Sequence, residues 1–188
     1  LGFTIALALA GCMPDLDDRV SVSHGAQYFA QNPTVEASRL VGNVNLDMPV
    51  LTYAFEDVVA FGSDRSTIES AVQAAAADMD MQLSPDPFPD QGLFTRSDHF
   101  RMVEIGVPAV FLATGLENGG DEAWATHFAK NYHRPSDDMD NALDFDAAAR
   151  FSEVNARIAL ELANRDERPL WRKDDFFARQ FNGPQTAK

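Results

Sequence analysis

The chain has 188 residues, of which 45% are hydrophobic and 23% charged, an ordinary balance for one globular domain. Fifteen Lys and Arg against twenty-nine Asp and Glu give a net charge of −14. This charge argues against a nucleic-acid partner and against an anionic membrane surface, because both need clustered positive side chains. The excess of carboxylates suits divalent cations instead, so individual Asp and Glu residues are candidate cation ligands.

The first ten residues are apolar and uncharged, but a segment of this length is too short to span a bilayer, which takes about 20 residues. Two interpretations stay open: the apolar part of a secretory signal, or a buried strand of a parallel sheet. In the first, residues 9–12 resemble a bacterial lipobox, and Cys12, the single cysteine, would carry a lipid anchor. The protein would then be exported, as a periplasmic protein, an outer-membrane lipoprotein or a secreted one. A truncated or frameshifted coding region is a third explanation, because the chain starts at Leu1.

The next elements alternate between strands and helices. Ser66 and Glu69 have the spacing of a capping box, which predicts that a helix starts there. Pro49 ends the strand before it, because proline has no N–H to donate. The expected elements are a helix at 25–31, strands at 39–46 and 57–61, a helix at 66–79, and a proline-rich loop at 84–92.

The second half continues the alternation. We expect a short helix at 97–105 capped by Ser97 or Asp98, a buried strand at 107–113, a long acidic connection at 114–143 and a helix at 146–164. The last helix is the clearest, because its apolar residues recur at steps of three and four. The aromatic segment after it should pack back in part. This order predicts an α/β fold with a mainly parallel sheet.

Two residues suit a metal site by their type and position. Asp47 follows a predicted strand, and ligands of open α/β sheets gather beyond the carboxyl ends of the strands. His133 lies in a polar loop, where Asp137 and Asp138 could orient its imidazole. Each also has a simpler interpretation, in which Asp47 caps a turn and His133 is a surface histidine.

Ser97, Asp98 and His99 include the residue types of a hydrolase triad, but consecutive side chains of a helix do not face one another. The nucleophile motif G-x-S-x-G is absent from the sequence. The carboxylates at 137–146 lack the central glycine and terminal glutamate of a calcium loop, so they are expected to be solvated. A serine hydrolase and an EF-hand are therefore not supported.

Taken together, four short segments are more specific than any one of them. The motifs at 45–48, 95–99, 106–112 and 132–138 resemble, in order and approximate spacing, the dizinc aminopeptidases, family twenty-eight of the metallopeptidases. The resemblance extends over about residues 25–181, which we expect to form the carboxyl-terminal portion of a zinc-peptidase domain. Residues 1–24 would precede this domain, and residues 182–188 would form a frayed tail.

The resemblance implies a three-layer α/β/α sandwich, incomplete at its amino-terminal side, and removal of N-terminal residues from peptide substrates. Two zinc ions would share a bridging water, whose pKa they lower. Asp47 would be a ligand of one zinc ion and His133 of the other. Asp98, His99 and Asp138 would lie near the substrate pocket or support the ligands.

The chain departs from the family where the family's general-base glutamate and its neighbour are expected, near Arg19 and Val20. Residues 1–24 contain no glutamate, and the family's upstream His-x-Asp ligands have no counterpart. No catalytic residue is therefore recognisable, and two of five expected ligands are present. We expect the chain to be inactive alone, because a zinc site takes three or four protein ligands. The alternative is an exported, non-catalytic pseudo-peptidase that binds peptides.

Overall fold

The computed structural model describes residues 4–9 and 24–187, and its centre is a five-stranded sheet in the order β1-β2-β5-β3-β4. Neighbouring strands are parallel except β3 and β5, which are antiparallel, so the prediction of a mainly parallel sheet is confirmed. Of the two interpretations of the apolar first segment, the structure contains the parallel strand. The strands are β1 Thr4–Leu9, β2 Leu40–Leu46, β3 Asp57–Phe61, β4 Gln82–Ser84 and β5 Ala109–Thr114.

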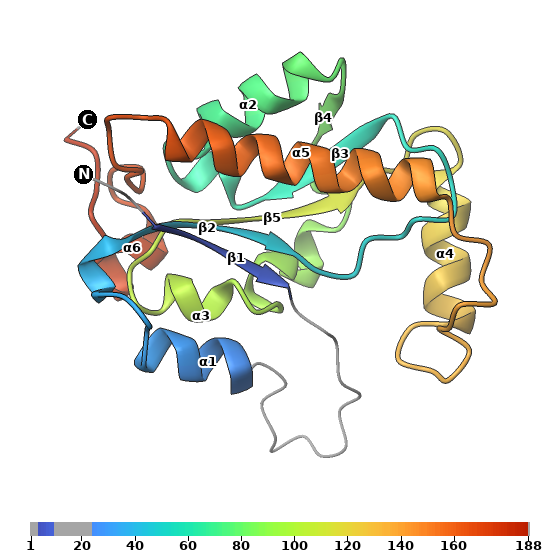
Figure 1. Ribbon diagram of the computed structural model, residues 1–188, viewed down its shortest axis with the longest axis horizontal. Coiled ribbons are helices and arrows are strands. Elements are labelled where there is room, and N and C mark those ends of the chain that lie inside the picture. The colour runs from blue at the N-terminus through green and yellow to red at the C-terminus, as the bar shows by residue number, and fades with distance from the viewer. Residues whose placement is uncertain (1–3, 10–23, 188) are drawn as a thin grey trace.

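Helices cover both faces of the sheet. Figure 1 shows α2 and α5 on one side of the sheet and α1 and α3 on the other, which confirms the three-layer α/β/α arrangement. Among the described residues, no helix combines the length and apolarity that crossing a bilayer requires. The helices are α1 His24–Gln31, α2 Glu69–Asp78, α3 Phe100–Val103, α4 Gly120–Lys130, α5 Phe145–Ala163 and α6 Phe176–Gln180, with 3₁₀ turns at Ala37–Arg39, Ser63–Arg65, Pro89–Gln91 and Leu93–Thr95.

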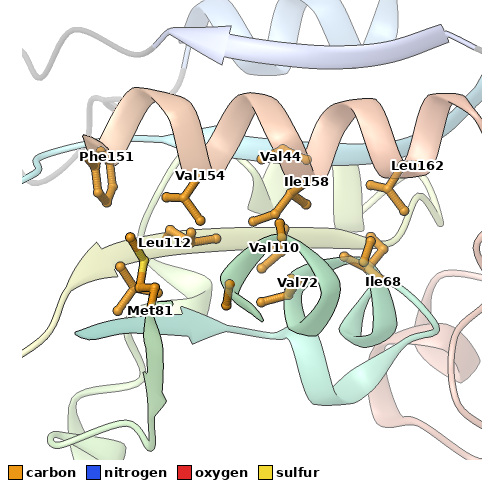
Figure 2. Close-up of a cluster of buried hydrophobic side chains, with 14 of the residues drawn as sticks. Val44, Ile68, Val72, Met81, Val110, Leu112, Phe151, Val154, Ile158 and Leu162 are labelled. Carbon is orange, nitrogen blue, oxygen red and sulfur yellow. The ribbon is translucent and has the colours of Figure 1, made fainter. Parts of the chain in front are cut away.

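The larger core lies between the sheet and the α2–α5 layer. The apolar stripe of α5 is buried there, as its three-and-four spacing predicts. Figure 2 shows this stripe facing Val110 and Leu112 of β5 and Val72 of α2. Asp144 begins α5, because its Oδ1 accepts hydrogen bonds from the backbone N of Asp146 at 3.0 Å and of Ala147 at 2.9 Å.

A second core fills the opposite face and includes the segment after α5. Trp171 is fully buried there, and its indole Nε1 donates to the Gly106 carbonyl at 2.9 Å. Residues 183–186, predicted to fray, return to the same residue: Trp171 N donates to Pro184 O and Thr186 N donates to Trp171 O. The carboxyl-terminal segment therefore completes the core.

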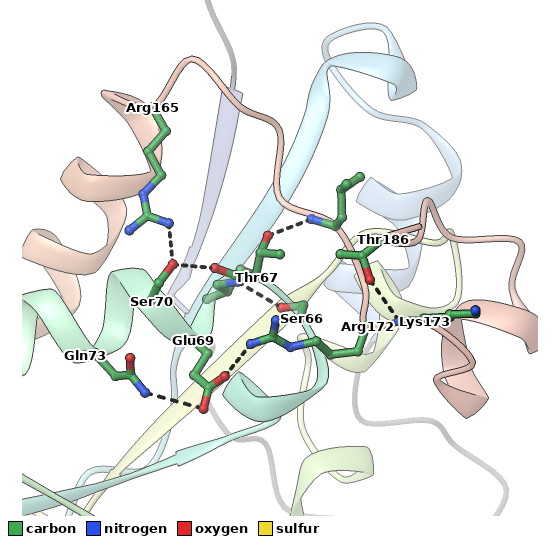
Figure 3. A network of polar contacts seen from close by, with 11 residues as sticks. Ser66, Thr67, Glu69, Ser70, Gln73, Arg165, Arg172, Lys173 and Thr186 are labelled. Atoms are coloured by element: carbon green, nitrogen blue, oxygen red, sulfur yellow. Dashed lines mark hydrogen bonds and ion pairs between the residues drawn. The ribbon is translucent and has the colours of Figure 1, made fainter. Parts of the chain in front are cut away.

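Polar contacts attach this segment to the start of α2. Figure 3 shows Arg165 bonded to Ser70 and Arg172 paired with Glu69, and within the segment it shows the backbone of Lys173 bonded to Thr186. Thr67 N also donates to the Leu170 carbonyl at 2.8 Å. Residues about 100 positions apart in the sequence are joined in this way.

Three local predictions are wrong. Helix α2 begins at Glu69, so the capping box does not form, and Ser66 Oγ instead accepts from Ile68 N. Helix α3 spans only Phe100–Val103, so its N-cap position is His99 and not the predicted Ser97 or Asp98. The acidic connection at 114–143 contains the helix α4, which was not predicted.

Candidate functional site

Three loops meet at one edge of the sheet. Strand β2 ends at Leu46, directly before Asp47, and β5 ends at Thr114. Because β3 is antiparallel to β5, the first residues of β3 lie beside the end of β5, with Val58 paired to Thr114. This edge lies beyond the carboxyl ends of the parallel strands, where ligands of α/β folds bind.

The carboxylate of Asp47 is oriented by two side chains. Ser97 Oγ donates to Asp47 Oδ2 at 2.6 Å and accepts from Asn45 Nδ2 at 2.9 Å. A serine hydroxyl has one proton to donate, so Asn45 directs that proton to Asp47. These contacts fix one carboxylate oxygen, in the way that metal-binding carboxylates are commonly oriented. Ser97 was expected only as a helix cap and Asn45 had no predicted role, because Ser97 lies about 50 positions from both Asp47 and Asn45 in the sequence.

The buried carboxylate of Asp57 contacts the segment between β5 and α4. Asp57 is 1% exposed, and its Oδ1 accepts from Glu117 N at 3.1 Å. A Cβ at Gly115 would lie 1.9 Å from Asp57 Oδ2, so this approach requires glycine. The hydroxyl of Tyr53 donates to the Gly115 carbonyl. Burial, together with the charge of Asp57, raises the pKa of the Tyr53 phenol, although hydrogen bonds from its surroundings oppose the shift.

Hydrogen bonds near Tyr53 join the segment after Asp47 to both ends of the stretch between β5 and α5, which contains α4. At its start, Asn118 Nδ2 donates to Ala54 O at 2.6 Å and Thr114 Oγ1 to Val50 O at 3.2 Å. At its end, Asp144 N donates to Leu51 O at 2.7 Å. The loop after Asp47 is thus hydrogen-bonded to both ends of the segment that carries His133, the other predicted metal ligand.

His133 lies three residues after the end of α4, in an exposed loop. Its φ is 55°, in the left-handed region, and its ring stacks on Tyr132 with centroids 3.9 Å apart and planes 19° apart. Asp138 is exposed in the same loop, where its Oδ1 accepts from Asp140 N at 3.0 Å.

Asp98 and His99 lie in the turn before α3, with different exposure. Asp98 is half-buried, whereas His99 is fully buried. The His99 ring packs against Phe94 and Phe111, with centroids 5.0 and 5.4 Å away. Burial lowers the pKa of His99 to about 4. The imidazole has no exposed surface, and the place of His99 near the substrate pocket or behind the ligands stays a prediction.

The described residues do not by themselves fit a zinc ion. Asp47 and His133 are the two donor side chains that the family resemblance assigns. Within residues 4–9 and 24–187, no three His, Cys, Asp or Glu side chains gather in a way that could hold a metal. Zinc takes three or four protein ligands, so further ligands would be needed. Cys12, the predicted lipidation site, lies outside the described residues.

One protein-family model matches most of the chain. The sequence model of Peptidase family M28 matches residues 21–159, a range that includes Asp47 and His133. No curated protein matches the chain in sequence.

Similar folds occur in several solved structures. An aminopeptidase from Aneurinibacillus sp. is 18% identical with a TM-score of 0.51, over 76% of this chain and 31% of its own. A zinc aminopeptidase from Bacillus subtilis is 16% identical with a TM-score of 0.53, over 77% of this chain and 34% of its own. A glutaminyl cyclase from Porphyromonas gingivalis is 18% identical with a TM-score of 0.52, over 78% and 49%. The chain therefore spans less than half the length of each of these proteins.

Proposed function

The chain belongs to Peptidase family M28, and from this premise we propose that it forms part of the catalytic domain of a zinc-dependent exopeptidase. Its substrate would be a peptide with a free amino terminus, which the enzyme shortens by one residue. Asp47 and His133 would be ligands of the two zinc ions, and the other ligands and the general base would come from residues not recognised in this chain. The isolated chain would then be inactive.

The observation that carries the proposal is the position of Asp47. It follows β2 directly, at the sheet edge where α/β folds bind ligands, and Ser97 orients its carboxylate. An aspartate that only capped a turn would not need a hydroxyl, itself oriented by Asn45, to fix its side chain. Two of the proteins with similar folds are named an aminopeptidase and a zinc aminopeptidase, and these names support the same proposal.

Hydrolysis of aminoacyl-nitroanilides, measured with added zinc, tests this function. The chain alone should give no turnover. The chain extended by its own upstream coding sequence, read in all three frames for His-x-Asp and Glu-Glu, should hydrolyse the substrates. In that protein Asp47→Ala and His133→Ala should each lower kcat/KM by more than about 100-fold, because a metal ligand is lost. Asp140→Ala, which removes an exposed carboxylate, is the matched control and should leave kcat/KM nearly unchanged.

Two results would contradict the proposal. The first is turnover by the extended protein that survives both ligand substitutions or removal of zinc by a chelator. The second is robust turnover by the chain alone that Asp47→Ala abolishes, which would contradict the expected inactivity while keeping the role of Asp47.

The second candidate is a non-catalytic, exported domain that binds peptides. The absence of a three-ligand cluster in the described part of the chain favours it. Binding of a peptide by the folded, monodisperse chain without zinc would support this candidate. Aggregation of the isolated chain would count against it.

Export and a lipid anchor at Cys12 remain proposals. Labelling of the expressed protein with a radioactive fatty acid, compared with Cys12→Ser, would test the lipid anchor.

A further inference from the structure

The loop between α4 and α5, residues 131–144, carries His133, and one side chain bonds to several of its parts. Asn141 Nδ2 donates to the carbonyl oxygens of Ser136 at 2.9 Å and Asp138 at 2.8 Å. Asn141 Oδ1 accepts from Asn131 Nδ2 at 2.9 Å, ten residues earlier. The amide therefore joins the first residue of this loop, called the His133 loop below, to its middle and its last turn.

Other contacts fix where the His133 loop leaves α4. Arg134 Nη1 donates to the Ala129 carbonyl at 2.6 Å, and Ser136 Oγ donates to the Lys130 carbonyl at 2.7 Å. Both carbonyls belong to the last turn of α4, where no further helical N–H is available to them. The hydroxyl of Ser136 thus bonds to α4, and its backbone carbonyl accepts from Asn141. Ser136 therefore links the contacts of Asn141 to the helix.

His133 has a left-handed backbone conformation, which is uncommon for residues other than glycine. A φ of 55° costs energy for a residue with a Cβ and persists only where neighbouring contacts impose it. The same conformation places the imidazole on the ring of Tyr132. We propose that Asn141 is a positioning residue, which holds the His133 loop so that the His133 imidazole stays stacked on Tyr132.

This inference rests on the proposed function for its meaning, because the position of His133 matters most if His133 is a metal ligand. The proposed role of Asn141 in holding the loop does not depend on that function, because the contacts of Asn141 involve no metal. The loop has no strand or helix of its own between residues 131 and 144, so its shape depends on side-chain contacts such as these. Asn141 makes three of them with one amide group.

Substitution of Asn141 by aspartate separates the proposed contacts from side-chain size. Asn141→Asp has nearly the same shape, but it puts an oxygen where Nδ2 donated to two carbonyl oxygens, so both bonds are lost and the oxygens repel. Asn141→Ala removes the contacts without adding charge. Ala142→Asp adds the same charge at the next, exposed position of the loop and is the matched control.

The measurement is the chemical shift of the His133 ring protons in the chain without zinc, assigned with His133→Gln. Stacking on Tyr132 should displace these signals upfield from those of free histidine. We expect Asn141→Asp and Asn141→Ala to move them toward the free position, and Ala142→Asp to leave them in place. His99, buried between Phe94 and Phe111, reports on the fold in the same spectra and should not move.

Unchanged His133 signals in both Asn141 variants would overturn the proposal. So would displacement of His99 in both variants, because Asn141 would then support the whole fold instead of the loop. If Asn141→Asp alone displaces the His99 signals, the His133 signals of Asn141→Ala decide whether the proposal holds. No zinc or substrate is present, so a negative result leaves the proposed function standing. Conversely, a failed hydrolysis test leaves this inference standing.

Discussion

His99 is the clearest case of a single residue whose environment sets its chemistry. Its Nε2 lies 2.6 Å from the Phe94 carbonyl oxygen, which can only accept, so Nε2 carries the proton. Nδ1 is buried and has no hydrogen-bond partner among the described residues. Protonation would place a charge and an unpaired N–H in the core, which explains why burial lowers the pKa of His99 to about 4.

The low pKa of His99 predicts a loss of stability in acid. Above pH 6.5 the imidazole is neutral in both the folded and the unfolded chain. As the pH falls from 6.5 to 4 only the unfolded chain gains the proton, so the free energy of unfolding should decrease by about 3 kcal/mol. Urea denaturation across this range should show a smaller decrease for His99→Gln. His24→Gln, at an exposed histidine of α1, should behave like the unchanged chain. Equal pH dependence in all three would contradict the prediction.

At the scale of elements, α4 and α5 differ in how much of their position is encoded locally. Helix α5 buries Phe151, Val154, Ile158 and Leu162 along one stripe. Helix α4 buries only Gly120 and Trp124, and two glycines lie at its start. Its pattern is therefore too weak to predict a helix from spacing alone. A contact with a distant element joins α4 to the sheet: Trp124 Nε1 donates to the carbonyl of Thr114, the last residue of β5, at 3.0 Å.

The stripe of α5 predicts a sharp difference between neighbouring positions. Ile158 is fully buried, whereas Leu160, two residues later, is 60% exposed. Ile158→Ala should lower the free energy of unfolding by about 2–5 kcal/mol, because it leaves a cavity between helix and sheet. Leu160→Ala, the matched control, should change it by about 0.5 kcal/mol or less. Urea denaturation followed by circular dichroism measures both, and similar losses would mean that α5 does not pack as described.

At the scale of the whole molecule, the carboxyl-terminal segment completes the second core and joins distant parts of the chain. Trp171 contacts Gly106 before β5 through its indole, and Gly183 lies so close to its ring that a Cβ would overlap it. Arg172 pairs with Glu69 at the start of α2. The fold of the sheet region and of this segment should therefore be one cooperative unit.

Trp171→Ala tests this cooperativity. It should lower the free energy of unfolding by about 3–5 kcal/mol, because a large buried side chain and its bond to Gly106 are lost. Phe176→Ala, at a 60% exposed residue of α6 in the same segment, is the control and should have a small effect. In thermal unfolding, Trp124 fluorescence and circular dichroism should still change together. A separate transition for the segment would contradict a single cooperative unit.

Features that depend on residues close together in the chain could be predicted from the sequence. The three-and-four spacing of α5 and the apolar runs of β2, β3 and β5 predict these elements within a few residues. The ordered short motifs around Asp47 and His133 indicated the family, which the family match confirms. The roles of the two residues as metal ligands stay predictions.

Features that join distant residues became visible in the three-dimensional structure alone. Ser97 was predicted as a helix cap, but it donates to Asp47, 50 positions away. The antiparallel pairing of β3 with β5 and the place of Asp57 beside Gly115 follow from packing of the whole sheet. No local spacing indicated Asn141. Hydrogen bonds of this kind depend on which side chains the fold brings together, and a residue's neighbours in the sequence do not contain that information.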